Sequence, residues 1–190
     1  MERMEQKILS EGKVLPGGIL KVGSFLNQQI DTAFLGQIGA EIARLFGGCG
    51  VTKVLTVESS GIAIAAAAGM AMGVPMVFAK KHRSSNVDGS VYSAVVHSFT
   101  HGADYTVVVS TDYLLPGDKV LLVDDFLANG KALQGLQELT RQAGAELAGA
   151  ACAIEKGFQG GGDALRARGV RVESLAIIDE MSDDGIRFRR

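Results

Sequence analysis

The stretch VLLVDDFLANGKAL, residues 120–133, combines three features that together predict a fold class. An apolar run, typical of a buried strand, ends in two adjacent carboxylates, Asp124 and Asp125. Small residues follow, none with a side chain that does chemistry, and they lead into a segment with helical periodicity. Strands that alternate with helices in this way are typical of α/β proteins with a parallel sheet.

The segments before this stretch predict a strand–helix–strand unit. Residues 31–46 carry an apolar helical stripe after Asp31, which is a good N-cap. Residues 52–59 and 74–81 are short apolar runs rich in strand formers, and an alanine-rich segment lies between them. Short connections between a strand, a helix and a strand predict a parallel pair with a right-handed crossover.

Beyond residue 81 the pattern changes before the parallel units resume. Residues 82–90 are polar without an apolar face, which predicts a mobile loop. Residues 91–114 read as an antiparallel hairpin at a sheet edge, with its turn at 100–103. Residues 131–144 predict a helix, and two more strands follow it, one of which ends at Lys156. We therefore expect one domain, residues 1–190, with a mostly parallel central sheet flanked by helices and an inserted antiparallel hairpin.

The composition excludes several functional classes. The chain has 190 residues, is 47% hydrophobic and has a formal net charge of −2. Without a long basic stripe, nucleic-acid binding is disfavoured. Residues 61–79 approach the length of a membrane span, but Gly69, Gly73 and Pro75 interrupt them, so we expect a buried helix followed by a buried strand. The charged N-terminal segment does not resemble a secretory signal, which favours a cytoplasmic location.

The cysteines and histidines give no sign of a metal site. Cys49 and Cys152 lie in apolar surroundings without metal-ligand spacing and are expected to be buried. His82, His97 and His101 match no metal-ligand spacing either. We therefore predict no metal site built from these side chains, and we expect no catalytic role for the histidines.

Three polar or small-residue segments follow predicted strands, where ligands bind in open α/β sheets. They are ESSG at 58–61, DDFLANGKA at 124–132 and EKGF at 155–158. Residues 128–132 can bring backbone N–H groups and a helix N-terminus close to a phosphate. Asp124 and Asp125 can accept hydrogen bonds from sugar hydroxyls. Taken separately, the loop is also compatible with an ordinary turn and N-cap, and the acids with a solvated strand end.

Taken together, these residues resemble a known family. VLLVDDFLANGKA is similar to the phosphoribosyl-pyrophosphate (PRPP) signature of the type I phosphoribosyltransferases. GGILKVGSFLNQQID, VTKVLTVESSG, QAGA, IEKGFQ and RVESLAII extend the resemblance to the bacterial xanthine phosphoribosyltransferase family over nearly the whole chain. The resemblance implies the type I fold, with a small N-/C-terminal hood that binds the base. It also implies purine salvage, in which xanthine and PRPP give xanthosine 5'-monophosphate and diphosphate.

The resemblance assigns the sugar-phosphate contacts to three parts of the chain. Asp124 and Asp125 would hold the ribose and stabilise an oxocarbenium-like transition state as catalytic residues. Backbone and side chains of the loop would hold the 5-phosphate: Ala128, Asn129, Gly130, Lys131 and Ala132. The diphosphate, with its Mg²⁺, would meet Ser59, Ser60 and Gly61. Lys81, at the base of the polar loop, would contact PRPP, and it is also compatible with a solvated edge. Lys131 departs from the signature, which usually has a small or polar residue there.

For the base, the resemblance implies contacts with Leu20, Asn27 and Lys156. A lysine ammonium donates to exocyclic oxygens, which xanthine, guanine and hypoxanthine have and adenine lacks. Phe158 either stacks on the purine or is a core aromatic. The glycine-rich stretch after Phe158 is unusual and leaves the boundary of the base pocket open.

Two alternatives remain at this level. A purine regulator of the same fold senses PRPP without catalysis, but it carries an N-terminal DNA-binding domain, and fewer than about 30 residues precede the predicted sheet here. A phosphoribosyltransferase for another purine, guanine or hypoxanthine before adenine, is the second. The resemblance also implies a homodimer.

Overall fold

The computed structural model describes residues 1–81, 90–98, 103–182 and 185–190. In this part of the chain the central sheet has six strands in the order β10-β9-β8-β7-β3-β4. They are β3 (Lys53–Val57), β4 (Met76–Ala79), β7 (Lys119–Leu127), β8 (Glu146–Lys156), β9 (Val172–Ser182) and β10 (Gly185–Phe188). Every neighbouring pair is parallel except β9 and β10. The predicted mostly parallel sheet is confirmed.

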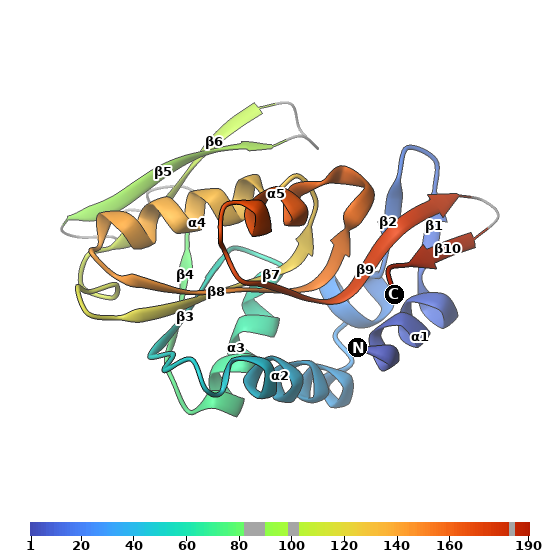
Figure 1. Cartoon of the computed structure of the whole chain (residues 1–190), viewed down its shortest axis with the longest axis horizontal. Helices are drawn as coiled ribbons and strands as arrows, with labels where there is room; N and C mark the ends of the chain where they lie inside the picture. Colours follow the sequence, from blue (N-terminus) through green and yellow to red (C-terminus); the bar gives the residue numbers. More distant parts are fainter. Residues whose placement is uncertain (82–89, 99–102, 183–184) are drawn as a thin grey trace.

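Helices cover both faces of this sheet (Figure 1). One face carries α2 (Thr32–Phe46) and α3 (Gly61–Met72), and the other carries α4 (Lys131–Gln142) and the short α5 (Gly161–Ala167). As predicted, α2 begins after Asp31, whose side chain accepts a hydrogen bond from the N–H of Phe34 at 3.0 Å. The leucines of α4 that recur at helical spacing are buried (Leu133, Leu136 and Leu139), as is the C-cap Ala143.

The alanine-rich segment forms α3 followed by β4, so the predicted helix and strand are both present. The expectation of a buried strand is wrong, because β4 is the edge strand of the sheet and Phe78 is 37% exposed. The small residues of α3 allow close helix packing, because a Cβ atom on Gly39 of α2 would lie 2.5 Å from the carbonyl oxygen of Ala67. None of the helices in the described ranges has the length and apolar character that a membrane crossing requires.

The predicted hairpin forms β5 (Val91–Ser98) and β6 (Ala103–Ser110). It is a separate two-stranded sheet rather than an edge of the central one, and one bridge between Lys80 and Val108 joins it to the segment after β4. The hairpin packs on the outer side of α4, where Gly135 leaves room for Val96. The predicted loop at 82–90, apart from Ser90, and most of the predicted turn at 100–103 lie outside the described residues.

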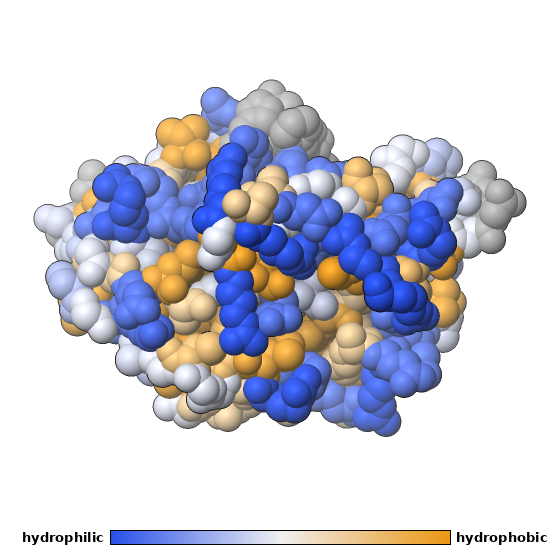
Figure 2. Space-filling model, in the orientation of Figure 1, coloured by the Kyte–Doolittle hydropathy of each residue, from blue (hydrophilic) through white to orange (hydrophobic). Residues whose placement is uncertain are grey.

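The two ends of the chain meet at one end of the sheet (Figure 1). α1 (Glu2–Glu11), the hairpin of β1 (Lys13–Leu15) and β2 (Ile19–Lys21), and the π-helical turn Gly23–Asn27 gather beside β9 and β10. The N-terminal ammonium of Met1 donates to the carbonyl of Leu175 in β9, and Met4 and Ile8 are fully buried. We call residues 1–27 together with β10 the hood. On the face shown in Figure 2, hydrophilic and apolar residues are interspersed.

Candidate active site

The two acids lie in β7, where the strand extends beyond its neighbour β3. β3 pairs with β7 only as far as Leu122, while β8 pairs with it as far as Leu127. Asp124 and Asp125 are the sixth and seventh of the nine residues of β7, whereas we had expected them at its end. Asp124 is 7% exposed, Asp125 is partly exposed, and the N–H of Asp125 donates to Oδ1 of Asp124 at 2.9 Å.

Burial makes the carboxyl of Asp124 electrostatically unusual. It raises the pKa of the Asp124 carboxyl well above its ordinary range, and the charge of Asp125 raises that pKa further. The positive charge of Lys81 acts in the opposite direction. The pKa of the Tyr105 hydroxyl is raised by burial and by Asp124. The pair thus offers negative charge and acceptor oxygens in a poorly solvated place, where hydroxyl donors and developing positive charge are stabilised.

The predicted phosphate loop connects β7 to α4. Gly130 has φ +79°, a left-handed conformation that favours glycine, and it caps α4. The side-chain oxygen of Asn129 accepts from the N–H of Lys131 at 3.1 Å, and the carbonyl of Ala128 accepts from the N–H of Gly161 at 3.2 Å. The side chain of Lys131 is exposed.

The predicted diphosphate loop, Ser59 to Gly61, connects β3 to α3 beside the acids. Gly61 is buried, and a Cβ atom there would lie 2.3 Å from Oγ1 of Thr56 and 3.1 Å from Oδ1 of Asp124. The close approach of this loop to Asp124 therefore requires glycine at position 61.

Two further side chains at this loop escaped the sequence analysis. The carboxylate of Glu58 accepts from the N–H of Lys81 at 2.6 Å, which ties the end of β3 to the residue from which the polar loop departs. The hydroxyl oxygen of Thr56 is buried and has no hydrogen-bond partner among the described residues. The sequence shows Glu58 directly before the two serines, but it gives no sign that the N–H of Lys81 is its partner.

The hood reaches the acids through Asn27. Its Nδ2 lies 3.4 Å from Oδ2 of Asp125. Asn27, which we expected to contact the purine base, is thus adjacent to Asp125, which we expected to contact the ribose. Leu20, also expected at the base, is buried in the apolar core of the hood.

Lys156, at the end of β8, contacts the hood from the other side. Its Nζ donates to the carbonyl of Gly18 at 2.8 Å and lies 5.6 Å from the ring centroid of Phe126. Burial lowers the pKa of this ammonium below its ordinary value of 10.5. Phe158 is 44% exposed, so the interpretation as a core aromatic is wrong, and its ring lies against the turn at Gly18.

The remaining candidates contribute little to this site. Cys152 is buried as expected, whereas Cys49 is only partly buried, so the expectation of burial is wrong for Cys49. Within the described ranges, no three His, Cys, Asp or Glu side chains lie together as a metal-binding group. His82, His101 and the side chain of His97 lie outside the described part of the chain.

The chain is similar to known proteins over most or all of its length. The phosphoribosyl transferase domain matches residues 35–163. Xanthine phosphoribosyltransferase 1 of Clostridium perfringens is 52% identical, with 100% of each chain covered. Xanthine phosphoribosyltransferase of Alkaliphilus metalliredigens is 51% identical, over 100% of this chain and 94% of that protein.

Among solved structures, the adenine phosphoribosyltransferase of Giardia lamblia complexed with 9-deazaadenine matches with a TM-score of 0.79 at 22% identity, over 94% of this chain and 98% of that one. The enzyme of Trypanosoma brucei in complex with AMP, pyrophosphate and ribose-5-phosphate gives 0.78 at 18% identity, over 96% and 82% of the two chains. At such identities these structures show only that the fold is the same. The relatives that are about half identical over the whole chain identify the family. The chain therefore belongs to the phosphoribosyltransferase family, in the group of the xanthine phosphoribosyltransferases.

Proposed function

We propose that the chain transfers the 5-phosphoribosyl group of PRPP to xanthine, giving xanthosine 5'-monophosphate and diphosphate. The single observation that carries this proposal is the contact between Asn27 and Asp125. It places a hood residue, which is proposed to contact the base, next to a carboxylate of β7, which is proposed to contact the ribose. A purine and a ribose held by these two residues would lie side by side, as the formation of a bond between them requires. Full-length relatives named for xanthine support the same reaction.

The sugar-phosphate part of the reaction falls to β7 and the two loops. Asp124 and Asp125 accept the ribose hydroxyls and stabilise positive charge that develops at the anomeric carbon. Backbone N–H groups of residues 128–132 bind the 5-phosphate at the start of α4. Ser59, Ser60 and Gly61 bind the leaving diphosphate at the start of α3, and Lys81 adds a positive charge there.

The base part falls to the hood and to the end of β8. Nζ of Lys156 donates to an exocyclic oxygen of the purine, as its present bond to the Gly18 carbonyl shows that it can reach an oxygen acceptor on the hood side. Asn27 contacts the base beside the sugar, Leu20 supports it from the core, and Phe158 offers an exposed ring for stacking. Adenine has no exocyclic oxygen, so this set of residues disfavours it.

Mg²⁺ fits this site as an ion that arrives with the substrate. The described residues hold no cluster of three His, Cys, Asp or Glu ligands of their own, while Asp124 and Asp125 supply carboxylate oxygens, which Mg²⁺ prefers, beside the diphosphate loop. When bound, Mg²⁺ would neutralise charge on the leaving diphosphate. We also propose a homodimer, as the family resemblance implies, and a cytoplasmic location. Light scattering after size-exclusion chromatography tests the dimer.

The decisive experiment is a spectrophotometric assay with PRPP, Mg²⁺ and xanthine, guanine, hypoxanthine, adenine or uracil as the base. We expect nucleotide formation with xanthine to be fastest and none with adenine or uracil. A chain that binds PRPP in calorimetry but turns over none of the five bases would instead be a PRPP-sensing regulator.

A further inference from the structure

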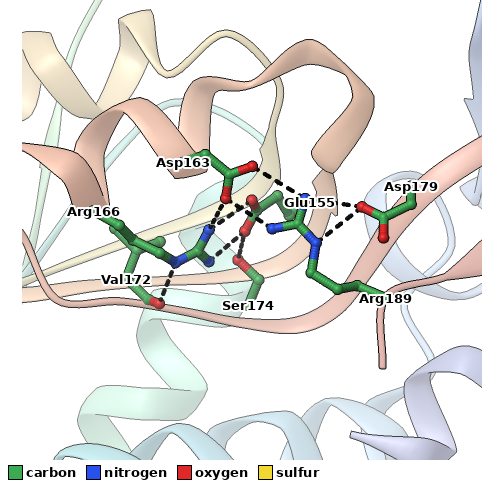
Figure 3. A network of polar contacts seen from close by, with 7 residues as sticks. All are labelled: Glu155, Asp163, Arg166, Val172, Ser174, Asp179 and Arg189. Atoms are coloured by element: carbon green, nitrogen blue, oxygen red, sulfur yellow. Dashed lines mark hydrogen bonds and ion pairs between the residues drawn. The ribbon is translucent and has the colours of Figure 1, made fainter.

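A fully buried carboxylate, Glu155, lies beneath α5 and has no part in the proposed chemistry (Figure 3). Its two oxygens accept from Nη1 and Nη2 of Arg166 at 2.9 and 2.7 Å, and Oγ of Ser174 donates to it at 2.5 Å. Arg166 belongs to α5, while Glu155 is the last residue but one of β8. A buried carboxylate with a bidentate guanidinium partner fixes both position and angle, because the two parallel hydrogen bonds define a plane.

A second layer of ion pairs braces α5 from outside (Figure 3). Asp163, in the first turn of α5, accepts from Arg166 and from both terminal nitrogens of Arg189. Arg189 also donates to Asp179 of β9 at 2.9 Å. These outer groups are more exposed than Glu155, so they contribute less to the position of α5 than the inner pair does.

Two adjacent glycines show how tightly α5 is seated. A Cβ atom on Gly162 would lie 2.1 Å from Oε1 of Glu155. A Cβ atom on Gly161 would lie 2.3 Å from the carbonyl oxygen of Ala128 and 2.5 Å from the nitrogen of Gly130. The start of α5 therefore packs against the buried carboxylate through Gly162 and against the backbone of the proposed phosphate loop through Gly161.

The contact with Gly161 also orients a peptide group of that loop. The N–H of Gly161 donates to the carbonyl of Ala128 at 3.2 Å, which turns this carbonyl toward α5. In a trans peptide the C=O and the following N–H point in opposite directions. The N–H of Asn129 consequently points away from α5, on the side that remains for a phosphate.

We propose that Glu155 and Arg166 are positioning residues for the phosphate loop, and that they act through the seating of Gly161 against Ala128. The inference rests on the proposed function in that the loop's ligand is the 5-phosphate of PRPP. It also gives a physical reason for the glycine-rich stretch after Phe158, which contains both glycines that make the contact.

The test is Glu155→Gln, which keeps the shape and an acceptor but removes the charge and one of the two bonds to Arg166. The matched control is Asp118→Asn, which weakens another poorly exposed ion pair, with Lys53 at 2.7 Å, at the opposite end of β7. Hydrogen–deuterium exchange of the ligand-free proteins should be faster in residues 126–132 of Glu155→Gln than in wild type, and unchanged there in the control. The KM for PRPP should rise about 10- to 100-fold, with kcat at saturating PRPP changed by less than about threefold.

A second variant, Gly161→Ala, leaves the Glu155–Arg166 pair intact and disturbs only the contact with the loop. It should weaken PRPP binding in calorimetry at least as much as Glu155→Gln does. Unchanged loop exchange in Glu155→Gln, or wild-type PRPP affinity in Gly161→Ala, would overturn the positioning role. If wild type itself does not bind PRPP, the proposed function fails, whereas the exchange data still decide whether Glu155 holds the loop.

Discussion

Replacing Lys156 with methionine removes an ammonium group while it keeps most of the side-chain volume that packs over Phe126. Nζ has three N–H donors, of which one is used by the carbonyl of Gly18, so the others remain for a purine oxygen. A hydrogen bond to a charged group contributes roughly 1.5–3 kcal/mol. If the proposed contact forms in the transition state, Lys156→Met should lower kcat/KM for xanthine about 10- to 150-fold.

The assay compares kcat/KM for xanthine, guanine and hypoxanthine, together with the affinity for PRPP measured by calorimetry. Lys156→Met should lower kcat/KM for all three oxopurines. It should leave PRPP affinity unchanged, because Lys156 does not belong to the proposed phosphate loop. Lys21→Met removes an exposed lysine from the same hood and should change none of these values. An unaltered kcat/KM for xanthine in Lys156→Met would refute the reasoning, as Asn27 or backbone groups would then read the base. Loss of PRPP affinity as well would mean that Lys156 supports the fold.

The pH dependence gives an independent check. Burial lowers the pKa of Lys156 below 10.5, so the ammonium is lost as pH rises through this lowered pKa. Activity with xanthine should therefore have an alkaline limb that Lys156→Met lacks. A lowered lysine pKa also means that the charged form opposes folding at pH values below it. Removing the charge in Lys156→Met should therefore not lower the melting temperature at neutral pH. Any change in melting temperature should be small, because solvent screens the charge of this half-exposed group.

The remaining predictions concern the sugar and the phosphate. Asp124→Asn or Asp125→Asn should lower kcat at least about tenfold, roughly 1.4 kcal/mol of transition-state stabilisation, and full activity in both would remove the sugar contact. Because the folded-state pKa of Asp124 is raised, its contribution to stability is present below the unfolded pKa and is lost as pH rises through the folded one. Asp124→Asn should therefore melt at a higher temperature than wild type at neutral pH. In acid this difference in melting temperature, measured by circular dichroism, should disappear. Gly130→Val introduces a branched side chain at φ +79°, 3.4 Å from Gly161 and Leu165, so PRPP affinity should collapse, and unchanged calorimetric binding would place the 5-phosphate elsewhere.

The parallel core could be predicted because its signals are local. Apolar runs of strand length, the N-cap at Asp31 and the leucine spacing of α4 each lie within a few residues of the element that they specify. The order of acids and small residues likewise identified the candidate phosphate loop without knowledge of its neighbours.

The hood and the contacts of the site could not be predicted in the same way. β1 and β2 have three residues each, too few for an alternating pattern. Lys156 and Gly18 are 138 positions apart, and the burial of Glu155 depends on Arg166 and Ser174, which belong to two other elements. Sequence patterns specify which faces of an element are apolar, but which two surfaces meet is decided by the packing of the whole chain.

The adjacency of Glu155 and Lys156 has a consequence for engineering the specificity of this protein. Successive side chains of a strand point to opposite sides, and here one contacts α5 while the next contacts the β1–β2 turn. A library randomised at Lys156 and at residues 16–18 should therefore sample new purine preferences against a constant sugar-phosphate site. A one-residue deletion in β8 before Glu155 should instead damage both sites, since it would put the ammonium of Lys156 beneath α5 and the carboxylate of Glu155 at the buried position of Ile154.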